Sequence, residues 1–145
     1  MDEHLRKSII LDHYNNPINK GLVEDDNYHK VNMNSESCID DLDFMIKIEN
    51  NIITDVRFDG EACAISTSAS SIMINLILNK SVDEVLNIIN NYENMIDEKD
   101  YDKELLEEAN VFDEIYKQAN RKKCALLPYH GLKKLLLEVR EKENV

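Results

Sequence analysis

Large hydrophobic or β-branched residues recur at every second position from residue 44 to 48 and again from 54 to 58. This period of two predicts two half-buried β-strands. Asn50-Asn51 lies between them and is typical of a tight hairpin turn, because asparagine tolerates positive φ. The alternating residues are Phe44, Ile46, Ile48, Thr54, Val56 and Phe58. We expect a short antiparallel sheet of about three strands, the third coming from the region before the hairpin.

Segments with helical spacing flank the predicted sheet. Residues 2–14 form the first, and Asn15-Asn16-Pro17 ends it. A helix rich in small residues starts at or just after Cys63, and Ser81-Val82-Asp83-Glu84 has the S-x-x-E form of a capping box that opens another. Together with the sheet, these helices predict an α+β fold.

The last helix is expected to begin near Cys124, because Pro128 lacks an N–H group and fits only the first helical turn. Its apolar face continues to Val139. A short peripheral helix is predicted around Leu105-Leu106. Residues 15–41 contain few apolar side chains and are expected to form a long loop that carries Cys38.

The chain has 145 residues and no break in composition, so residues 1–145 are expected to form one domain. A net charge of −12 and a pI near 4.7 argue against a nucleic-acid partner, because phosphate binding depends on clustered Lys and Arg. The chain shows neither a signal-peptide pattern nor the roughly 18 consecutive apolar residues of a membrane span. We expect a cytoplasmic protein that does not bind membranes.

Three cysteines cannot all pair within one molecule, and reducing compartments disfavour disulfides, so thiols with a metal or redox role are expected. Cys63 and Cys124 lie at predicted helix starts, where the helix dipole favours thiolates. Asp40 follows Cys38 by two residues. Three thiolates and one carboxylate match tetrahedral zinc or part of an iron–sulfur cluster. The spacing alone fits equally well with small buried cysteines and an Asp40 that caps a turn.

Four motifs occur in order along the chain: ILDHYNNPINKG from Ile10 to Gly21, Cys38-Ile39-Asp40, GEACAIS from Gly60 to Ser66, and KCALLPYHGL from Lys123 to Leu132. With the hairpin between them, these motifs resemble the IscU/SufU family of iron–sulfur scaffold and sulfur-transfer proteins over nearly the whole chain. The family is related to the N-terminal part of nitrogen-fixation (NifU) scaffold proteins. The resemblance implies an IscU/SufU-like fold.

Two details favour the SufU branch of this family. Lys123 stands where the IscU branch has a histidine ligand, and the 61 residues from Cys63 to Cys124 leave room for the extra helical segment of SufU proteins. The resemblance then implies a zinc ion on Cys38, Asp40, Cys63 and Cys124. It also implies acceptance of persulfide sulfur from a cysteine desulfurase.

Cys38 is the expected sulfur acceptor, because it lies on the predicted loop whereas the other two cysteines are held by helices. Arg121 matches a family arginine near the site; it either pairs with Asp40, steers an anionic persulfide, or is a solvated surface charge.

Ile39 and Ala62 replace two family glycines, and Ser35-Glu36 replaces the family's Asn-Pro. These replacements affect loop geometry and leave every expected ligand in place.

Two other functions remain open at this point. The first alternative is a scaffold that assembles an iron–sulfur cluster and passes it to apo-proteins or downstream assembly factors. The second is a binding module whose metal is only structural. His13 and His130 are expected to be structural, since the ligand set is complete without them. The serine run 66–71 is expected to serve close helix packing.

Overall fold

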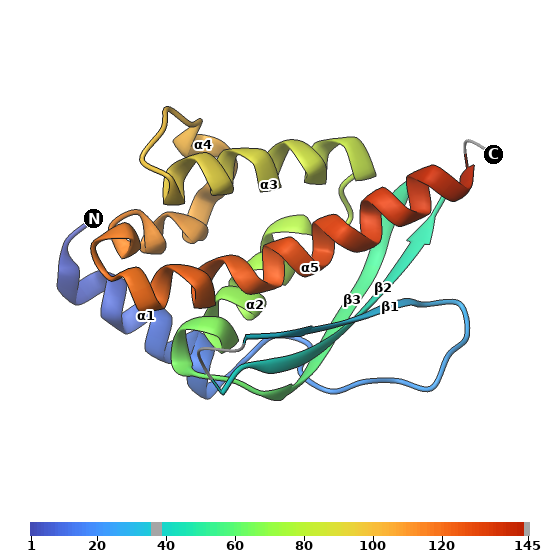
Figure 1. Cartoon of the computed structure of the whole chain (residues 1–145), viewed down its shortest axis with the longest axis horizontal. Helices are drawn as coiled ribbons and strands as arrows, with labels where there is room; N and C mark the ends of the chain where they lie inside the picture. Colours follow the sequence, from blue (N-terminus) through green and yellow to red (C-terminus); the bar gives the residue numbers. More distant parts are fainter. Residues whose placement is uncertain (36–38, 144–145) are drawn as a thin grey trace.

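The computed structural model describes residues 1–35 and 39–143, and Figure 1 shows their arrangement. The helices and strands follow in the order α1 (Glu3–Asn15), β1 (His29–Asn34), β2 (Asp41–Glu49), β3 (Ile52–Glu61), α2 (Ala64–Ile77), α3 (Val82–Ile96), α4 (Lys103–Leu106), the 3₁₀ helices η1 (Glu107–Phe112) and η2 (Ile115–Lys117), and α5 (Ala119–Glu143). The predicted α+β class is confirmed.

The sheet is antiparallel with strand order β1-β2-β3. Asn50 and Asn51 join β2 to β3 with φ angles of 52° and 64°, and Glu49 pairs with Ile52 across the turn. Positive φ at both central residues is the geometry of a type I′ turn, whose twist matches that of paired strands. The predicted hairpin and the three-stranded sheet are therefore confirmed.

Strand β1 supplies the third strand from the region before the hairpin, as expected. The expectation of a loop throughout residues 15–41 is wrong for His29–Asn34, which pairs with β2. Only Val31 and Met33 in this strand pack against the core, while Asn32 on the opposite face donates hydrogen bonds to two aspartates of β2. Two apolar residues at alternate positions are too few to predict a strand from periodicity.

The helices pack against one another and against one face of the sheet, with the long α5 crossing the strands (Figure 1). Gly131 allows this crossing, because a Cβ atom there would lie 2.7 Å from Met33 Cγ of β1. The core is continuous from the sheet to α3, where the rings of Tyr92 and Tyr129 stack with centroids 3.6 Å apart.

Two helix starts agree with the sequence. The Ser81 hydroxyl accepts a hydrogen bond from the Glu84 N–H at 3.1 Å, which confirms the capping box of α3. Cys63 is the N-cap of α2, as predicted. Helix α4 lies where the short peripheral helix around Leu105-Leu106 was expected.

The predicted start of the last helix is wrong. Helix α5 begins at Ala119, so Pro128 lies in the interior of the helix and Cys124 is not at its N-terminus. Proline removes the N–H that would otherwise bond to the carbonyl four residues earlier, which is that of Cys124. The Ser66 hydroxyl lies 3.1 Å from this carbonyl oxygen and donates to it instead. A tertiary contact thus replaces a helical hydrogen bond.

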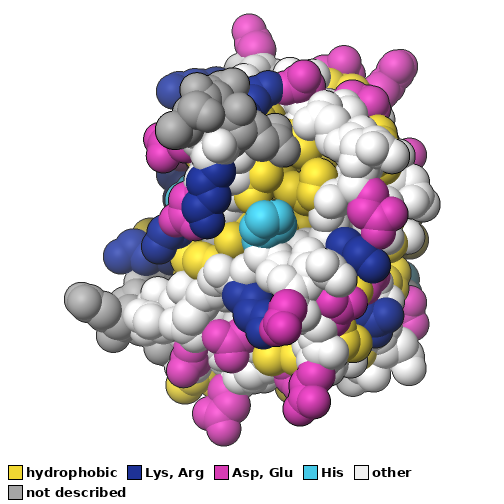
Figure 2. Space-filling model, turned by 90° about the vertical axis from the view of Figure 1, so that its right-hand side faces the viewer, with side chains coloured by type: hydrophobic (Ala, Val, Ile, Leu, Met, Phe, Trp, Pro, Cys, Tyr) yellow, Lys and Arg dark blue, Asp and Glu magenta, His cyan; other side chains and the backbone are white. Residues whose placement is uncertain are grey.

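Figure 2 shows the face at the C-terminal end of the molecule, where acidic and basic side chains surround a hydrophobic hollow with a histidine at its centre. A pocket between α5 and the start of β1 is lined by His29, Leu135 and Val139 among others. Within the described part of the chain, no helix is both long and apolar enough to cross a lipid bilayer.

Candidate metal centre

Asp40, Cys63 and Cys124 converge at one point, with a carboxylate oxygen and two sulfur atoms all within 4.8 Å of one another. They come from three separate elements: the residue before β2, the N-cap of α2, and the first turns of α5. Asp40 and Cys124 are buried and Cys63 is half-buried. Among the described residues, this is the group whose positions suit a metal ion.

Hydrogen bonds hold the Asp40 carboxylate on both oxygens. Oδ1 accepts from the Cys63 N–H at 2.8 Å, and Oδ2 accepts from the Ser66 hydroxyl at 2.5 Å. Burial raises the pKa of Asp40, but these hydrogen bonds and those from the thiols of Cys63 and Cys124 outweigh it and lower that pKa below the ordinary value. The carboxylate is therefore kept charged although only 1% of the residue is exposed.

The Cys63 sulfur accepts a hydrogen bond from the Ser66 N–H at 3.4 Å and lies 3.9 Å from Asp40 Oδ2. The Ser66 N–H belongs to the first turn of α2, so the Cys63 sulfur caps the N-terminus of this helix. Bound sulfur and oxygen ligands of tetrahedral zinc lie about 3.5–3.8 Å apart, given bonds near 2.3 and 2.0 Å. The observed separation suits such an ion.

Cys124 is not placed as the sequence predicted. Its thiol lies inside α5 and donates to the carbonyl oxygen of Asn120 at 3.7 Å, instead of receiving N–H groups at a helix start. This contact uses the proton of the sulfur, which metal ligation displaces. The geometry still brings Cys124 close to Asp40, so the two residues converge although Cys124 does not lie at a helix start.

The expected ligand and sulfur acceptor Cys38 lies outside the described residues. The two thiols and one carboxylate that are described form a set that zinc prefers, with one position left in a four-coordinate shell. Neither Ile39 nor Ala62 is among the described residues with positive φ, so replacing the family glycines causes no backbone strain at these positions.

Ser66 is the functional residue that sequence reasoning missed. It was interpreted as one of several small residues for helix packing, and its neighbours do behave so: Ser68 and Ser70 are buried and donate to carbonyls of their own helix. Ser66 instead points its hydroxyl at Asp40 and the Cys124 carbonyl. The signal available in the sequence was its position three residues after an N-cap.

Arg121 and two histidines are the other predicted site residues, and the histidines contact residues outside this centre. The side chain of Arg121 is exposed, and within the described chain it forms no ion pair with Asp40. His13 is buried between Ser71 (2.7 Å) and Glu108 (2.5 Å), and His130 lies 3.4 Å from Glu93. Both histidines make structural contacts, and neither belongs to the converging group.

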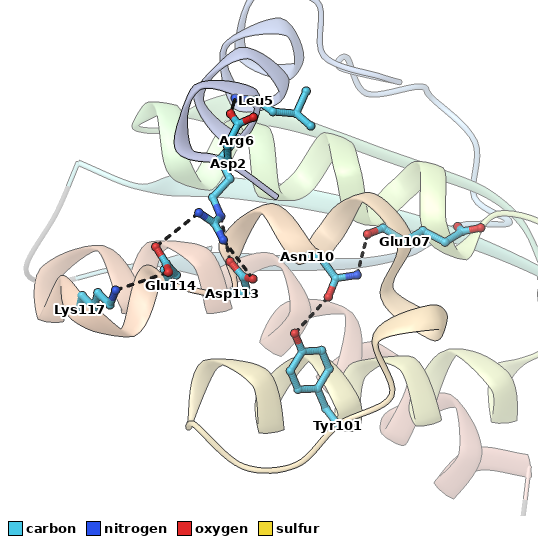
Figure 3. Close-up of polar contacts among 9 residues, drawn as sticks. All are labelled: Asp2, Leu5, Arg6, Tyr101, Glu107, Asn110, Asp113, Glu114 and Lys117. Atoms are coloured by element: carbon cyan, nitrogen blue, oxygen red, sulfur yellow. Dashed lines mark hydrogen bonds and ion pairs between the residues drawn. The ribbon is translucent and has the colours of Figure 1, made fainter.

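The segment α4–η2 follows α2 and α3 in the long interval between Cys63 and Cys124, and Arg6 of α1 contacts it (Figure 3). The Arg6 guanidinium contacts Asp113 with two nitrogens at 3.0 and 3.3 Å and Glu114 at 3.4 Å. Paired contacts of this kind fix a carboxylate in orientation as well as position. These contacts tie the segment that precedes α5 to α1.

Comparison with known proteins places these features in a family context. The family model described as NifU-like N terminal domain matches residues 5–125. The chain is 33% identical over 131 residues to the zinc-dependent sulfurtransferase SufU of Bacillus subtilis, a match that covers 90% of this chain and 88% of that protein. It is 28% identical over 130 residues to the iron-sulfur cluster assembly scaffold protein IscU of Thermotoga maritima, covering 90% and 91%.

Solved structures agree with this similarity. A crystal structure of a putative iron-sulfur cluster assembly scaffold protein for the SUF system from Fervidobacterium islandicum AW-1 matches with a TM-score of 0.83 and 29% identity, covering 93% of this chain and 99% of that one. A NifU-like N-terminal protein from Brucella abortus shares the fold, with a TM-score of 0.79 and 20% identity over 92% of this chain and 93% of that one.

Proposed function

The chain belongs to the family of NifU-like N-terminal domains, and from that premise we propose that it is an iron–sulfur cluster biogenesis protein. Its activity is that of a zinc-dependent sulfurtransferase, which accepts persulfide sulfur from a cysteine desulfurase. The observation that carries this proposal is the convergence of Asp40, Cys63 and Cys124. Similarity to a SufU protein over most of both chains supports it.

Zinc is held in this proposal by Cys38, Asp40, Cys63 and Cys124. Bound zinc keeps its sulfur ligands deprotonated at neutral pH. The chain itself orients Asp40 through the Cys63 N–H and the Ser66 hydroxyl, and it orients the Cys63 sulfur through the Ser66 N–H. Because a carboxylate is a weaker partner than a thiolate for a borderline-soft ion, the mixed set suits a site whose ligands must exchange.

Sulfur transfer begins when the Cys38 thiolate attacks the outer sulfur of the desulfurase persulfide. The S–S bond of the donor breaks, a new S–S bond forms on Cys38, and the donor cysteine leaves as a thiolate. No oxidant or reductant is required, because one persulfide replaces another. Cys38 is assigned as the acceptor because Cys63 and Cys124 are held at the N-cap of α2 and within α5, whereas the sequence predicts a loop position for Cys38.

Arg121 assists by attracting the anionic persulfide group from solvent, since its cation is exposed three residues before Cys124. The partners are the desulfurase and, downstream, apo iron–sulfur proteins or other assembly factors. Nucleic acid and membranes are not partners, in agreement with the acidic balance of the chain. We place the protein in the cytoplasm, where thiols stay reduced.

The scaffold function is the second candidate, supported by the similarity to IscU proteins. On this alternative, an iron–sulfur cluster is assembled on the same ligands and passed to apo-proteins. Two features favour the sulfurtransferase. Lys123 cannot act as the histidine ligand of the IscU branch, and its side chain is exposed. The α4–η2 segment occupies the interval in which SufU proteins carry extra helical structure.

The first experiment measures zinc, iron and acid-labile sulfide in protein purified under reducing conditions. We expect about one zinc per chain, as in a single four-coordinate site, and loss of that zinc in Asp40→Ala. Iron with matching sulfide, together with a cluster that transfers to an apo-protein, would establish the scaffold instead.

The second measurement is the turnover of a SufS-like cysteine desulfurase with and without this protein. The proposal predicts enhanced turnover, which Cys38→Ala abolishes while Asp100→Ala, an exposed residue of the α3–α4 connection, leaves it intact. Full sulfur acceptance by Cys38→Ala would refute the assigned acceptor. If the protein binds zinc but does not change desulfurase turnover, the metal has only a structural role.

A further inference from the structure

One hydroxyl group touches all three residues of the candidate metal centre. Ser66 is fully buried, and its Oγ lies 2.5 Å from Asp40 Oδ2, 3.1 Å from the Cys124 carbonyl oxygen and 3.6 Å from the Cys63 sulfur. The first two are acceptors for its proton, and the thiol of Cys63 donates to it. The Ser66 hydroxyl therefore contacts a group of each of the three residues.

Ser66 differs from the other serines of α2 because of its place in the helix. Ser68 donates to the Ala64 carbonyl at 2.7 Å and Ser70 to the Ser66 carbonyl at 2.8 Å, which is the usual bond of a serine within a helix. Ser66 lies in the first turn of α2, and its hydroxyl donates to no carbonyl of its own helix. Its hydroxyl is consequently free to bond across to other elements.

Pro128 accounts for the second acceptor. In an uninterrupted helix the carbonyl of Cys124 accepts the N–H of residue 128, and proline has none. The open carbonyl faces Ser66, which shares its single proton between this oxygen and the nearer Asp40 carboxylate. Pro128 and Ser66 thus form a matched pair that joins α5 to α2 beside the centre.

We propose that Ser66 is a positioning residue of the metal centre, which holds the Asp40 carboxylate and the Cys124 main chain in ligand geometry, and that Pro128 keeps the Cys124 carbonyl open for this contact. The inference rests on the proposed metal binding. Groups behind metal ligands orient them, and their removal typically lowers metal affinity about 10–100-fold. The same loss is expected for Ser66→Ala.

The test measures zinc affinity by competition with a chelator, well below the unfolding temperature of each variant. Ser66→Ala is expected to bind zinc about 10–100-fold more weakly than the wild type. Ser70→Ala is the matched control, since it removes a buried hydroxyl that bonds only within α2, and we expect unchanged affinity. Equal affinities of Ser66→Ala and Ser70→Ala, with the wild type binding zinc, would overturn the proposal.

A second measurement decides the proposal without metal. In the metal-free protein, Ser66→Ala is expected to lower the thermal midpoint more when residue 128 is proline than in a Pro128→Ala background, where an N–H group fills the Cys124 carbonyl. If the two substitutions lower the thermal midpoint additively, the proposed contact between Ser66 and the Cys124 carbonyl does not exist. If the wild type binds no zinc, the proposed zinc-dependent function is wrong. The comparison of the single and double variants in the metal-free protein then decides alone whether Ser66 positions Asp40 and Cys124.

Discussion

Gly60 lies at the end of β3, where it pairs with Leu42 beside the candidate centre. Its φ is +134°, and an added Cβ atom would lie 2.1 Å from the carbonyl oxygen of Asp41. Accommodating the Cβ atom requires a shift of the Asp41 main chain, and the neighbouring Asp40 is a proposed ligand. We expect Gly60→Ala to cost at least about 2 kcal/mol of unfolding free energy and to weaken zinc binding, as measured by urea unfolding and chelator competition.

Gly21→Ala is the control for this substitution. Gly21 also has a positive φ, +124°, but no atom lies within 4 Å of its added Cβ. Only backbone strain is expected there, about 1 kcal/mol, with zinc affinity unchanged. If both variants lose the same free energy, the clash with Asp41 does not exist and the prediction is wrong.

Asp55 in β3 makes the free energy of unfolding depend on pH. The Tyr28 hydroxyl and Arg57 Nε both donate to its carboxylate, the latter at 3.0 Å. Burial raises the pKa of Asp55, but the hydrogen bonds from Tyr28 and Arg57 outweigh it and lower that pKa below the ordinary value. A lowered folded-state pKa stabilises the protein above the unfolded-state pKa, and the effect is lost as pH falls through the folded-state value.

Asp55→Asn tests this linkage through unfolding free energies measured across pH. At pH 7 we expect the variant to be less stable by about 1–2 kcal/mol, the usual value of hydrogen bonds to a charged group. The difference should shrink once the pH falls below about 4, where an ordinary aspartate protonates. Asp100→Asn, on the exposed α3–α4 connection, serves as control. A difference that stays constant down to acid pH would contradict the assignment.

At the scale of elements, the anchorage of the η1–η2 segment depends on Arg6 (Figure 3). Its side chain is only 15% exposed and Asp113 is 27% exposed, so solvent screens the pair less than it screens a surface pair. We expect Arg6→Ala to cost about 1–2 kcal/mol of unfolding free energy. Faster hydrogen exchange should appear in Glu107–Lys117.

The neighbouring residue Lys7 supplies the comparison for Arg6. Lys7 pairs with Glu3 on the same helix at 3.5 Å, and both side chains are more than three-quarters exposed. Exposed pairs of this type contribute little, so Lys7→Ala should leave stability and exchange nearly unchanged. If both variants behave alike, the Arg6 contacts do not hold the segment in place.

Sequence periodicity predicted those elements whose signals are local. The hairpin around Asn50-Asn51 and the capping box at Ser81 each depend on a few adjacent residues, and both are confirmed. The start of α5 was predicted wrongly, because Pro128 is normally a sign of a helix start. In the helix interior, the carbonyl that Pro128 leaves open accepts a hydrogen bond from Ser66, a residue distant in sequence, which a local pattern does not reveal.

At the scale of the whole molecule, the metal centre is assembled from residues that the sequence separates widely. Asp40, Cys63 and Cys124 were predicted from cysteine chemistry and family motifs, and the structure brings these three together. Spacing alone did not predict their convergence, since it depends on α2, α5 and the sheet packing as one unit. The role of Ser66 was missed because its position three residues after an N-cap does not show what its hydroxyl contacts, and both acceptors belong to residues distant in sequence, Asp40 and Cys124.

Because the proposed ligands belong to different elements, metal binding should stabilise the fold as a whole. The core of sheet and helices does not include the ligand side chains of Asp40 and Cys63, so the metal-free protein is expected to stay folded, unlike a zinc finger. Zinc at a thousand times its dissociation constant adds about 4 kcal/mol. For a chain of this size, 1 kcal/mol shifts the thermal midpoint by about 2–4 °C.

Chelation of the zinc-loaded protein should therefore lower its thermal midpoint by roughly 8–16 °C, while far-ultraviolet circular dichroism at room temperature stays unchanged. Asp40→Ala is the control, since a variant without zinc has no metal to lose and its midpoint should not respond to the chelator. Equal midpoints with and without bound zinc would mean that the unfolded chain binds the ion as tightly as the folded one. The convergence of the three residues would then have no thermodynamic effect on folding, because only preferential binding to the native state stabilises it.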